Sequence, residues 1–264
     1  MARFYTLFSG SSGNSYYIGS EKVGILVDAG RTAKQLDTML ARCGISSEAI
    51  QGIFVTHEHS DHIKGLRVFA SKHHLPVFAS AGTLAELERI NCLSTKYEAN
   101  VIENNGIECA GMFIKPFHTS HDSAESIGYR IDTHDGRQIA ISTDLGYMSE
   151  EVRQEMTGAD MIVLESNHDI GMLQNGPYPY YLKRRILSKT GHLSNAACAE
   201  ELYHFVSSGT TRFVLTHLSS ENNTPELAYQ TSLCSLSMSG LKQGIDFELY
   251  VAPKENSEGK MILF

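Results

Sequence analysis

The sequence predicts an α+β fold of four layers, in which two β-sheets lie face to face between outer helices, an αββα sandwich. Strand-like runs rich in aromatic and β-branched residues come in two batches, and each batch is followed by helix-like segments. Two mostly antiparallel sheets with helices outside satisfy that order. The chain of 264 residues is 42% hydrophobic and shows no linker or internal repeat. We therefore expect a single domain over residues 1–264 with a large buried core.

The first batch of strands is separated by glycine-rich turns. Strands are expected at residues 3–8, 16–18, 23–27 and 52–56. Helices are expected at residues 32–43, 63–73 and 83–90. In the first helix, Leu36, Met39 and Leu40 recur on one face, which is typical of a helix packed on a sheet.

The second batch begins near the middle of the chain. Strands are expected at residues 106–117, 127–132, 137–142, 161–164 and 213–215. Helices are expected at residues 150–156, 180–188, 195–207 and 225–236. Several of these strands run directly into polar segments that contain histidine or aspartate.

Composition limits the functional classes. No apolar run is long enough to span a bilayer, and residues 1–8 read as a first strand rather than a signal peptide. The five scattered cysteines argue against a disulfide framework, so we expect a cytoplasmic protein without membrane insertion. The net charge of -8 argues against a protein that coats nucleic acid, but not against a nuclease whose metal ions supply local positive charge.

A histidine cluster follows the strand at 52–56. In an extended turn, His57 and His59 point the same way and can bind one metal, whereas Asp61 and His62 can face a second. A pair of metals roughly 3.5–4 Å apart fits such a segment. The alternative is a polar turn whose histidines cap the next helix. Three histidines and an aspartate in six residues favour the metal site.

Further candidate ligands follow other strands, where a catalytic site can hold them rigidly. His118 and His121 follow one strand, Asp144 a second and His217 a third. Taken singly, Asp144 could instead cap a helix, and His217 could be a hydrogen-bonded core residue.

An H-x-H-x-D-H signature followed by a lone His, a lone Asp and a lone His resembles the metallo-β-lactamase superfamily. Over nearly the whole chain, the sequence resembles more narrowly the YycJ/WalJ/VicX family of bacterial cytoplasmic proteins. The motifs are Ser9-Gly10-Ser11-Ser12-Gly13-Asn14-Ser15, Thr56-His57-Glu58-His59-Ser60-Asp61-His62, Thr119-Ser120-His121-Asp122, Leu164-Glu165-Ser166-Asn167-His168-Asp169, Gly191-His192-Leu193-Ser194-Asn195 and His217-Leu218-Ser219-Ser220-Glu221-Asn222-Asn223.

The resemblance implies a metal-dependent 5′-to-3′ DNA exonuclease, with DNA or RNA as substrate, and a functional link to a two-component cell-wall regulatory system. It implies two divalent metal ions (Zn²⁺, Mn²⁺ or Fe²⁺). One would be held by His57, His59 and His121, the other by Asp61, His62 and His217, with Asp144 bridging. His121 is preferred to His118 because the family ligand directly precedes an aspartate.

In the mechanism that this ligand set implies, a metal-bridging hydroxide attacks phosphorus and Asp61 orients it. His192 is the candidate proton donor or phosphate contact, as in the histidine loop of ribonuclease Z, although its loop could simply cap the next helix. The candidate substrate contacts are Ser12, Asn14, Asn167, His168, Asn222 and Asn223. Turn formation explains the serine and three of the asparagines (Asn14, Asn222 and Asn223) about as well.

Two other functions compete with the nuclease hypothesis. The same metals could hydrolyse a small ester, thioester or cyclic phosphodiester, because fold does not fix function. A metal-binding signalling partner without catalysis is the other alternative, and the full ligand set argues against it. The segment from Asp144 to His217 is too short for the nucleic-acid clamp of ribonuclease J. Contacts with nucleic acid must then come from loops such as 178–185. The tyrosines of this segment could stack on bases or lie in the core, and its basic residues could simply form an exposed helix face.

Overall fold

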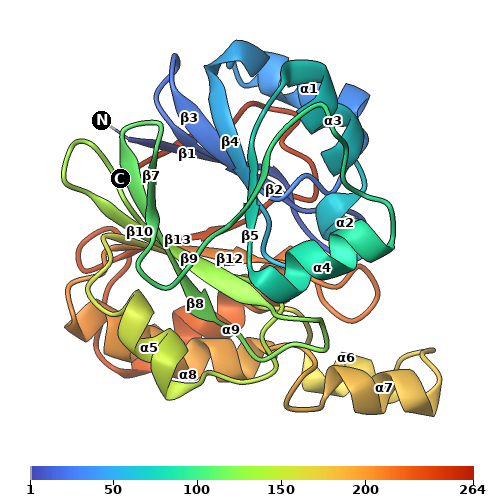
Figure 1. The fold of residues 1–264 in the computed structure, drawn as a ribbon. Helices are drawn as coiled ribbons and strands as arrows, with labels where there is room; N and C mark the ends of the chain where they lie inside the picture. Colours follow the sequence, from blue (N-terminus) through green and yellow to red (C-terminus); the bar gives the residue numbers. More distant parts are fainter. Residues whose placement is uncertain (1) are drawn as a thin grey trace. The chain divides into compact units, whose positions relative to one another are not determined.

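The computed structural model, drawn as a ribbon in Figure 1, describes residues 2–264. The chain divides into two compact units. The first unit contains the chain up to Pro116, then Ser123–Arg137 and Pro253–Phe264, and the second contains Phe117–Asp122 and Gln138–Ala252. Because the C-terminal segment returns to the first unit, residues from both ends of the chain share one sheet. The expectation of one domain across the chain stays a prediction.

The first unit is built on a seven-stranded sheet with the order β14-β1-β2-β3-β4-β5-β6. The strands are β1 (Arg3–Phe8), β2 (Ser15–Gly19), β3 (Gly24–Val27), β4 (Ile50–Phe54), β5 (Val77–Ala79), β6 (Ala99–Val101) and β14 (Ile262–Leu263). The pairs from β14 to β3 are antiparallel, whereas β3, β4, β5 and β6 are parallel neighbours. The expectation of a mostly antiparallel sheet is therefore wrong for half of these pairs.

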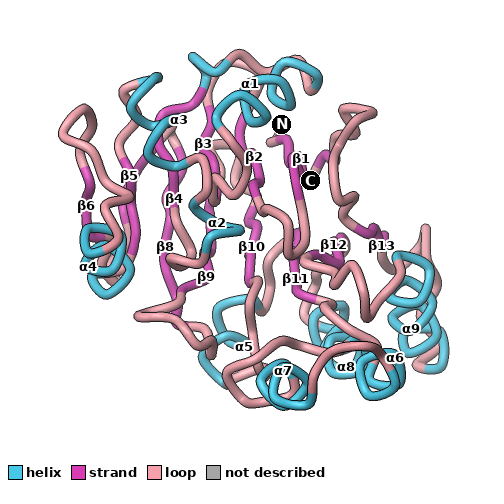
Figure 2. The backbone as a smooth tube through the Cα atoms, turned by 90° about the vertical axis from the view of Figure 1, so that its right-hand side faces the viewer, coloured by secondary structure: helices cyan, strands magenta, loops and turns pink. Residues whose placement is uncertain are grey.

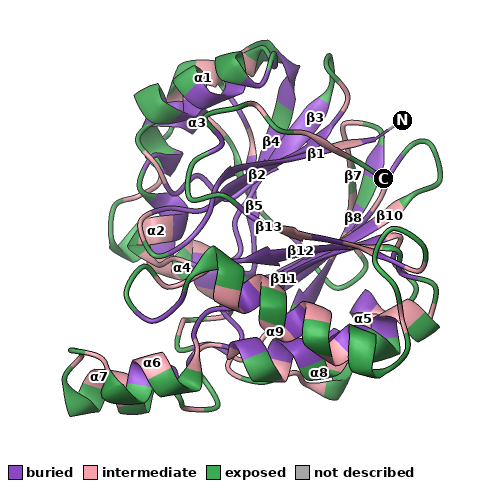
Figure 3. Ribbon diagram, turned by 180° about the vertical axis from the view of Figure 1, so that it is seen from behind, coloured by how far each residue is buried: buried purple, intermediate pink, exposed green. Residues whose placement is uncertain are grey.

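Helical crossovers explain the parallel half of this sheet, since parallel neighbours need a long connection that returns the chain to the same edge. The connecting helices are α1 (Ala33–Arg42), α2 (Ser60–Ile63), α3 (Leu66–His73) and α4 (Ala81–Arg89). Helix α1 begins at a capping box in which Thr32 and Gln35 bond each other's backbone. Its apolar face, with Leu36 and Leu40, is buried on the sheet, which α1 and α3 cover from the same side (Figures 1 and 3).

A β-hairpin precedes the second unit along the chain. Strands β7 (Ile107–Cys109) and β8 (Met112–His118) are antiparallel, with Cys109 opposite Met112. The single strand expected at 106–117 is therefore two strands. The turn falls at Ala110 and Gly111, which both have positive φ, at 55° and 69°. Strand β9 (Ile127–Asp132) follows in the first unit.

The second sheet has the strand order β13-β12-β11-β10-β9-β8-β7. In the second unit, β10 (Gln138–Ser142), β11 (Met161–Glu165), β12 (Arg212–Thr216) and β13 (Glu248–Val251) are all parallel. Figure 2 draws these strands in magenta. The antiparallel expectation is wrong here too, for the same reason. The crossovers run through α5 (Glu150–Met156), α8 (Asn195–Ser207) and α9 (Pro225–Met238).

Burial separates the layers of the second unit. Phe213 on β12 and Phe205 on α8 belong to one buried apolar cluster between the strands and α5, α8 and α9. Two short helices, α6 (Ile170–Asn175) and α7 (Tyr180–Ile186), lie to one side of that helix layer and are largely exposed (Figure 3). Among residues 2–264, the helices include none with the length and apolar character needed to cross a bilayer.

Candidate metal centre

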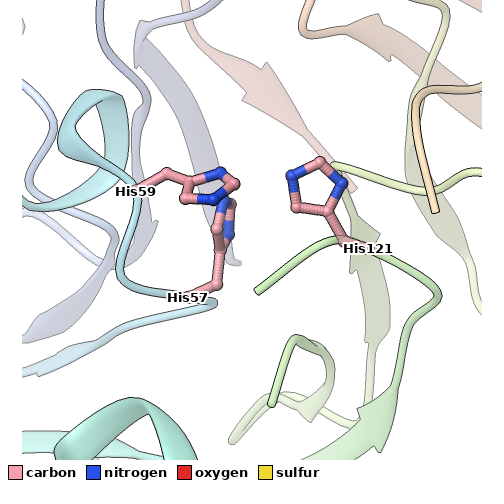
Figure 4. Close-up of side chains that lie close together, drawn as sticks. All are labelled: His57, His59 and His121. Atoms are coloured by element: carbon pink, nitrogen blue, oxygen red, sulfur yellow. The ribbon is translucent and has the colours of Figure 1, made fainter. Parts of the chain in front are cut away.

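In the first unit, the chain leaves β4 and places three imidazoles in one turn. His57 and His62 are fully buried, and their ring centroids are 4.1 Å apart. The His59 ring lies edge-on to the His57 ring, with centroids 4.6 Å apart (Figure 4). His59 is the N-cap of α2, so the short helix carries Asp61 and His62 on its first turn. This half of the predicted ligand set is therefore gathered within six residues.

Asp28, at the end of β3, holds this turn in place. Its carboxylate accepts hydrogen bonds from the Thr56 amide at 2.8 Å, the Thr56 hydroxyl at 2.9 Å and His62 Nδ1 at 2.7 Å. Burial raises the pKa of Asp28, and the adjacent His62 and Thr56 oppose that rise. With Nδ1 directed at Asp28, His62 turns Nε2 toward Asn14 Nδ2 (3.0 Å) and Asp61 Oδ2 (3.6 Å).

The glycine-rich loop after β1 clasps the same turn. The Asn14 amide donates to the Asp61 carbonyl at 2.7 Å, and the Gly30 amide donates to the Asn14 carbonyl at 2.8 Å. A methyl group on Gly30 would lie 1.8 Å from the Asp61 carbonyl oxygen, so only glycine fits there. Asn14 is buried within this clasp, whereas Ser12 is half-buried and accepts from Arg31 at 2.8 Å. Their predicted contacts with substrate stay predictions.

In the second unit, Glu165 at the end of β11 organises three loops. Its Oε1 accepts from His192 Nδ1 and His217 Nδ1, both at 2.8 Å. Its Oε2 accepts from the amides of Leu145 at 2.8 Å and Leu193 at 3.0 Å. Burial by itself would raise the pKa of the Glu165 carboxyl, but the two imidazoles lower it to about 2. Glu165 is therefore a buried carboxylate that fixes two histidine rings at once.

The remaining predicted ligands lie around Glu165. His121 directs Nδ1 at the Gly191 carbonyl, 3.0 Å away, and its Nε2 lies 3.7 Å from Asp144 Oδ1. Asp144 Oδ1 is also 3.6 Å from His217 Nδ1. Ligand atoms all within 4.8 Å of one another are offered by Asp144, Glu165, His192 and His217. The second unit thus gathers its own part of the predicted set.

The two rival histidines after β8 have different environments. His118 ends the strand, is exposed, and has Nδ1 3.3 Å from the Glu151 carboxylate. The His121 side chain is buried beside Asp144 (Figure 4 draws its ring). This placement agrees with the preference for His121, although its role as a ligand stays a prediction.

Two of the asparagines predicted to touch substrate donate hydrogen bonds to backbone carbonyls, and their substrate contacts stay predictions. Asn167 donates to the His217 carbonyl at 2.9 Å. Asn223 donates to the carbonyls of Ser166 at 2.9 Å and Asn167 at 3.0 Å. Both are buried, so each has a structural role whether or not it also meets substrate.

Asn222 and His168 are buried in the same region. The Asn222 carbonyl accepts from the Asp169 amide at 2.9 Å. Burial lowers the pKa of His168 to about 4, so this imidazole is neutral near pH 7. Contacts of these two side chains with substrate stay predictions.

Three residues of the candidate site have backbone conformations that non-glycine residues adopt rarely. The φ angles of Asp28, Asp144 and His217 are 62°, 55° and 56°. Left-handed conformations of this kind cost energy and concentrate at functional sites. Here each one turns the chain sharply after a strand and aims a polar side chain at the cluster of its own unit.

The side chains in both clusters fit divalent metal ions. Imidazole and carboxylate together suit zinc, manganese and iron. A metal-binding histidine commonly gives its second nitrogen to a carboxylate or carbonyl, which fixes the ring. His62, His121 and His217 all show that arrangement, through Asp28, Gly191 and Glu165. The roles of Asp28 and Glu165 were missed from the sequence, where each is an acidic residue at a strand end and Glu165 also lies in one of the family motifs.

The family model and the similar proteins identify the same family for this chain. A model of the beta-lactamase superfamily domain matches residues 24–218. The exodeoxyribonuclease YycJ of Bacillus anthracis is 37% identical over 248 residues, which are 94% of this chain and 94% of that protein. The exodeoxyribonuclease WalJ of Streptococcus pneumoniae serotype 2 (strain D39 / NCTC 7466) is 36% identical over 251 residues, covering 94% and 93%.

Among solved structures, the metallo-beta-lactamase fold protein YhfI from Bacillus subtilis superimposes with a TM-score of 0.73. The match covers 100% of both chains at 15% sequence identity. The α+β fold class expected from the sequence is thereby confirmed.

Proposed function

The chain belongs to the beta-lactamase superfamily, and within it to the family of the exodeoxyribonucleases YycJ and WalJ, and on that premise we propose that it is a dinuclear-metal 5′-to-3′ DNA exonuclease. The observation that carries the proposal is 37% identity over 94% of both chains to a protein named as an exodeoxyribonuclease. Membership of this family confirms the expectation of a metal-dependent hydrolase.

The proposed ligands come from both units. His57, His59 and His121 would hold one ion, Asp61, His62 and His217 the other, and Asp144 would be shared. The support is the chemistry of the donors, namely buried imidazoles whose second nitrogens are already fixed by Asp28, Gly191 and Glu165. Zinc, manganese and iron all suit these donors. When bound, two such ions supply Lewis acidity and positive charge toward a phosphate.

Asp61 would orient the attacking water, and His192 would donate a proton to the leaving group. Asp61 lies next to His62 and is partly exposed, so it would accept a hydrogen bond from the attacking water and orient it. His192 gives its Nδ1 to Glu165, so its Nε2 is the atom that would donate a proton to the leaving oxygen. Glu165 would stabilise the protonated ring during that transfer.

The test uses metal-loaded protein and single-stranded or duplex oligonucleotides labelled at either end. We expect mononucleotides to be released from the 5′ end in Mn²⁺ or Zn²⁺, and no release after chelation or in Asp61→Ala. Glu88→Ala, which removes an exposed carboxylate on α4, should retain activity. Release from the 3′ end would overturn the polarity. Cleavage of small esters without any cleavage of DNA would favour the small-ester alternative.

A matched pair of histidine variants tests the ligand set. Wild type should hold two divalent ions per chain by elemental analysis. His121→Ala should lose metal and activity, whereas His118→Ala should keep both, because His118 is exposed and pairs with Glu151. Equal losses in the two variants would contradict the proposed ligands.

A further inference from the structure

A long stretch of the second unit carries only positive formal charge. Between Ile170 and Ala199 the sequence contains four lysines or arginines and no aspartate or glutamate, although the whole chain has 30 acidic and 22 basic residues. The stretch includes α6 and α7, which we call the basic arm (residues 170–191). In a protein with a net charge of -8, a segment that contains only basic charges has a local positive potential that favours binding of an anion.

The outer face of the basic arm carries aromatic rings that the fold does not bury. Tyr180 and Tyr181 are 76% and 74% exposed. The Arg184 guanidinium lies 6.0 Å from the centre of the Tyr180 ring, and the Lys189 ammonium lies 6.0 Å from that of Tyr147. Tyr147 is itself 44% exposed. Exposed rings beside exposed cations form a surface on which unpaired bases can stack while phosphates pair with the charges.

The other two cations of the arm serve to fix it. Lys183 donates to the carbonyls of Gln174 and Gly176, both at 2.8 Å, and so ties α7 to the end of α6. Arg185 makes a two-pronged ion pair with Asp122, with Nη2 at 2.7 Å from Oδ1. Of the four cations of the arm, Arg184 and Lys189 are therefore the two that can pair with an anionic ligand.

The arm is bonded directly to the loop that contains the candidate ligand His121. The Ser120 hydroxyl donates to the Lys189 carbonyl at 2.6 Å, and the Asp122 amide donates to the Thr190 carbonyl at 3.1 Å. His121 itself bonds the Gly191 carbonyl. The end of the arm is thus hydrogen-bonded to the ligand loop at three points, which places that end beside the candidate metal ligand.

We propose that the basic arm binds single-stranded DNA, with bases stacked on Tyr180 and Tyr181 and phosphates paired with Arg184 and Lys189. This inference rests on the proposed function, because it names the part of the substrate that the exonuclease grips. Duplex DNA is a poorer fit, since paired bases do not offer their faces to aromatic side chains.

Binding of a fluorescent 20-nucleotide oligothymidine, with phosphorothioate terminal linkages to resist digestion, tests the inference on the metal-loaded protein. Because the double variant Tyr180→Ala/Tyr181→Ala removes the stacking of two bases, it should raise Kd about 30-fold or more. The double Tyr→Phe variant keeps the rings and should restore binding. Tyr203→Ala, which removes an exposed tyrosine from α8, should bind like wild type.

Salt dependence separates direct phosphate pairing from a general structural effect. For single strands, log K falls with log salt concentration, and the magnitude of that negative slope decreases by about 0.7 for each phosphate that the protein no longer neutralises. Arg184→Ala and Lys189→Ala should each reduce the magnitude of the slope by about that amount. Lys242→Ala, at an exposed lysine outside residues 170–191, should leave the slope unchanged.

The outcomes distinguish this inference from the proposed function. If wild type digests DNA but the double Tyr→Ala variant binds it equally well, the arm proposal fails and the exonuclease proposal stands. If the wild type binds oligothymidine but cuts no polynucleotide, and the double Tyr→Ala variant loses that binding, the exonuclease proposal fails and the arm proposal stands. Failure of wild type to bind oligothymidine, or loss of binding in the Tyr→Phe variant with unchanged thermal unfolding, also overturns the arm proposal.

Discussion

Replacing Glu165 by glutamine tests how far one buried carboxylate organises the second half of the centre. The side chain is fully buried and accepts four hydrogen bonds, from the rings of His192 and His217 and the amides of Leu145 and Leu193. Glutamine has nearly the same shape, but it has no charge and only one oxygen. The variant therefore changes the hydrogen bonding with little change in packing.

The magnitude follows from those four bonds. A hydrogen bond to a charged group contributes about 1 kcal/mol more than a neutral one, so the four bonds together lose about 4 kcal/mol. Removal of a buried charge offsets part of this loss, and we expect a net fall of about 2 kcal/mol in the free energy of unfolding. The backbone amides cannot become acceptors, so the glutamine oxygen should stay with Leu145 and Leu193. The glutamine NH₂ then faces His192 and His217, and their protons should move from Nδ1 to Nε2.

That change of tautomer removes the lone pair that His217 would offer a metal through Nε2. We expect metal affinity to fall by about 10- to 100-fold, as is typical when the hydrogen-bond partner of a metal-binding histidine is removed. Urea denaturation of the metal-free protein measures the first effect, and competition with a chromophoric chelator measures the second. Glu200→Gln, an exposed site on α8, is the control. If Glu165→Gln matched that control in both assays, the organising role would be refuted.

Three further substitutions test other parts of the structure. Asp28→Asn should weaken metal binding about 10-fold or more, because the amide no longer holds the His62 Nδ1 proton; unchanged affinity in a chelator competition would contradict this. Gly30→Ala should cost about 3 kcal/mol in urea unfolding, since the new methyl would overlap the Asp61 carbonyl, and a loss below about 1 kcal/mol would show that the clasp can open. Phe213→Ala, in the buried core of the second unit, should cost about 3–5 kcal/mol in the same assay, and a near-neutral result would be incompatible with a close-packed core.

The sequence by itself determined most of the elements and the candidate ligands. The helix expected at 32–43 is α1, because its apolar spacing and its N-terminal threonine are local signals. The polar clusters at His57–His62, His121, Asp144 and His217 follow strands as expected. Local patterns carry this information because the face that a strand or a helix buries is set by residues only a few positions apart.

The tertiary structure decided the strand pairing and the residues that hold the ligands. Parallel and antiparallel neighbours have similar sequence patterns, so the parallel halves of both sheets emerged only once the crossover helices were placed. Asp28 is one acidic residue at a strand end among others, and the motif that contains Glu165 does not show which atoms its carboxylate holds. Their partners lie 28 to 34 residues away for Asp28, and 20 to 52 residues away for Glu165. A hydrogen bond over such a separation depends on the whole path of the chain, which no local pattern encodes.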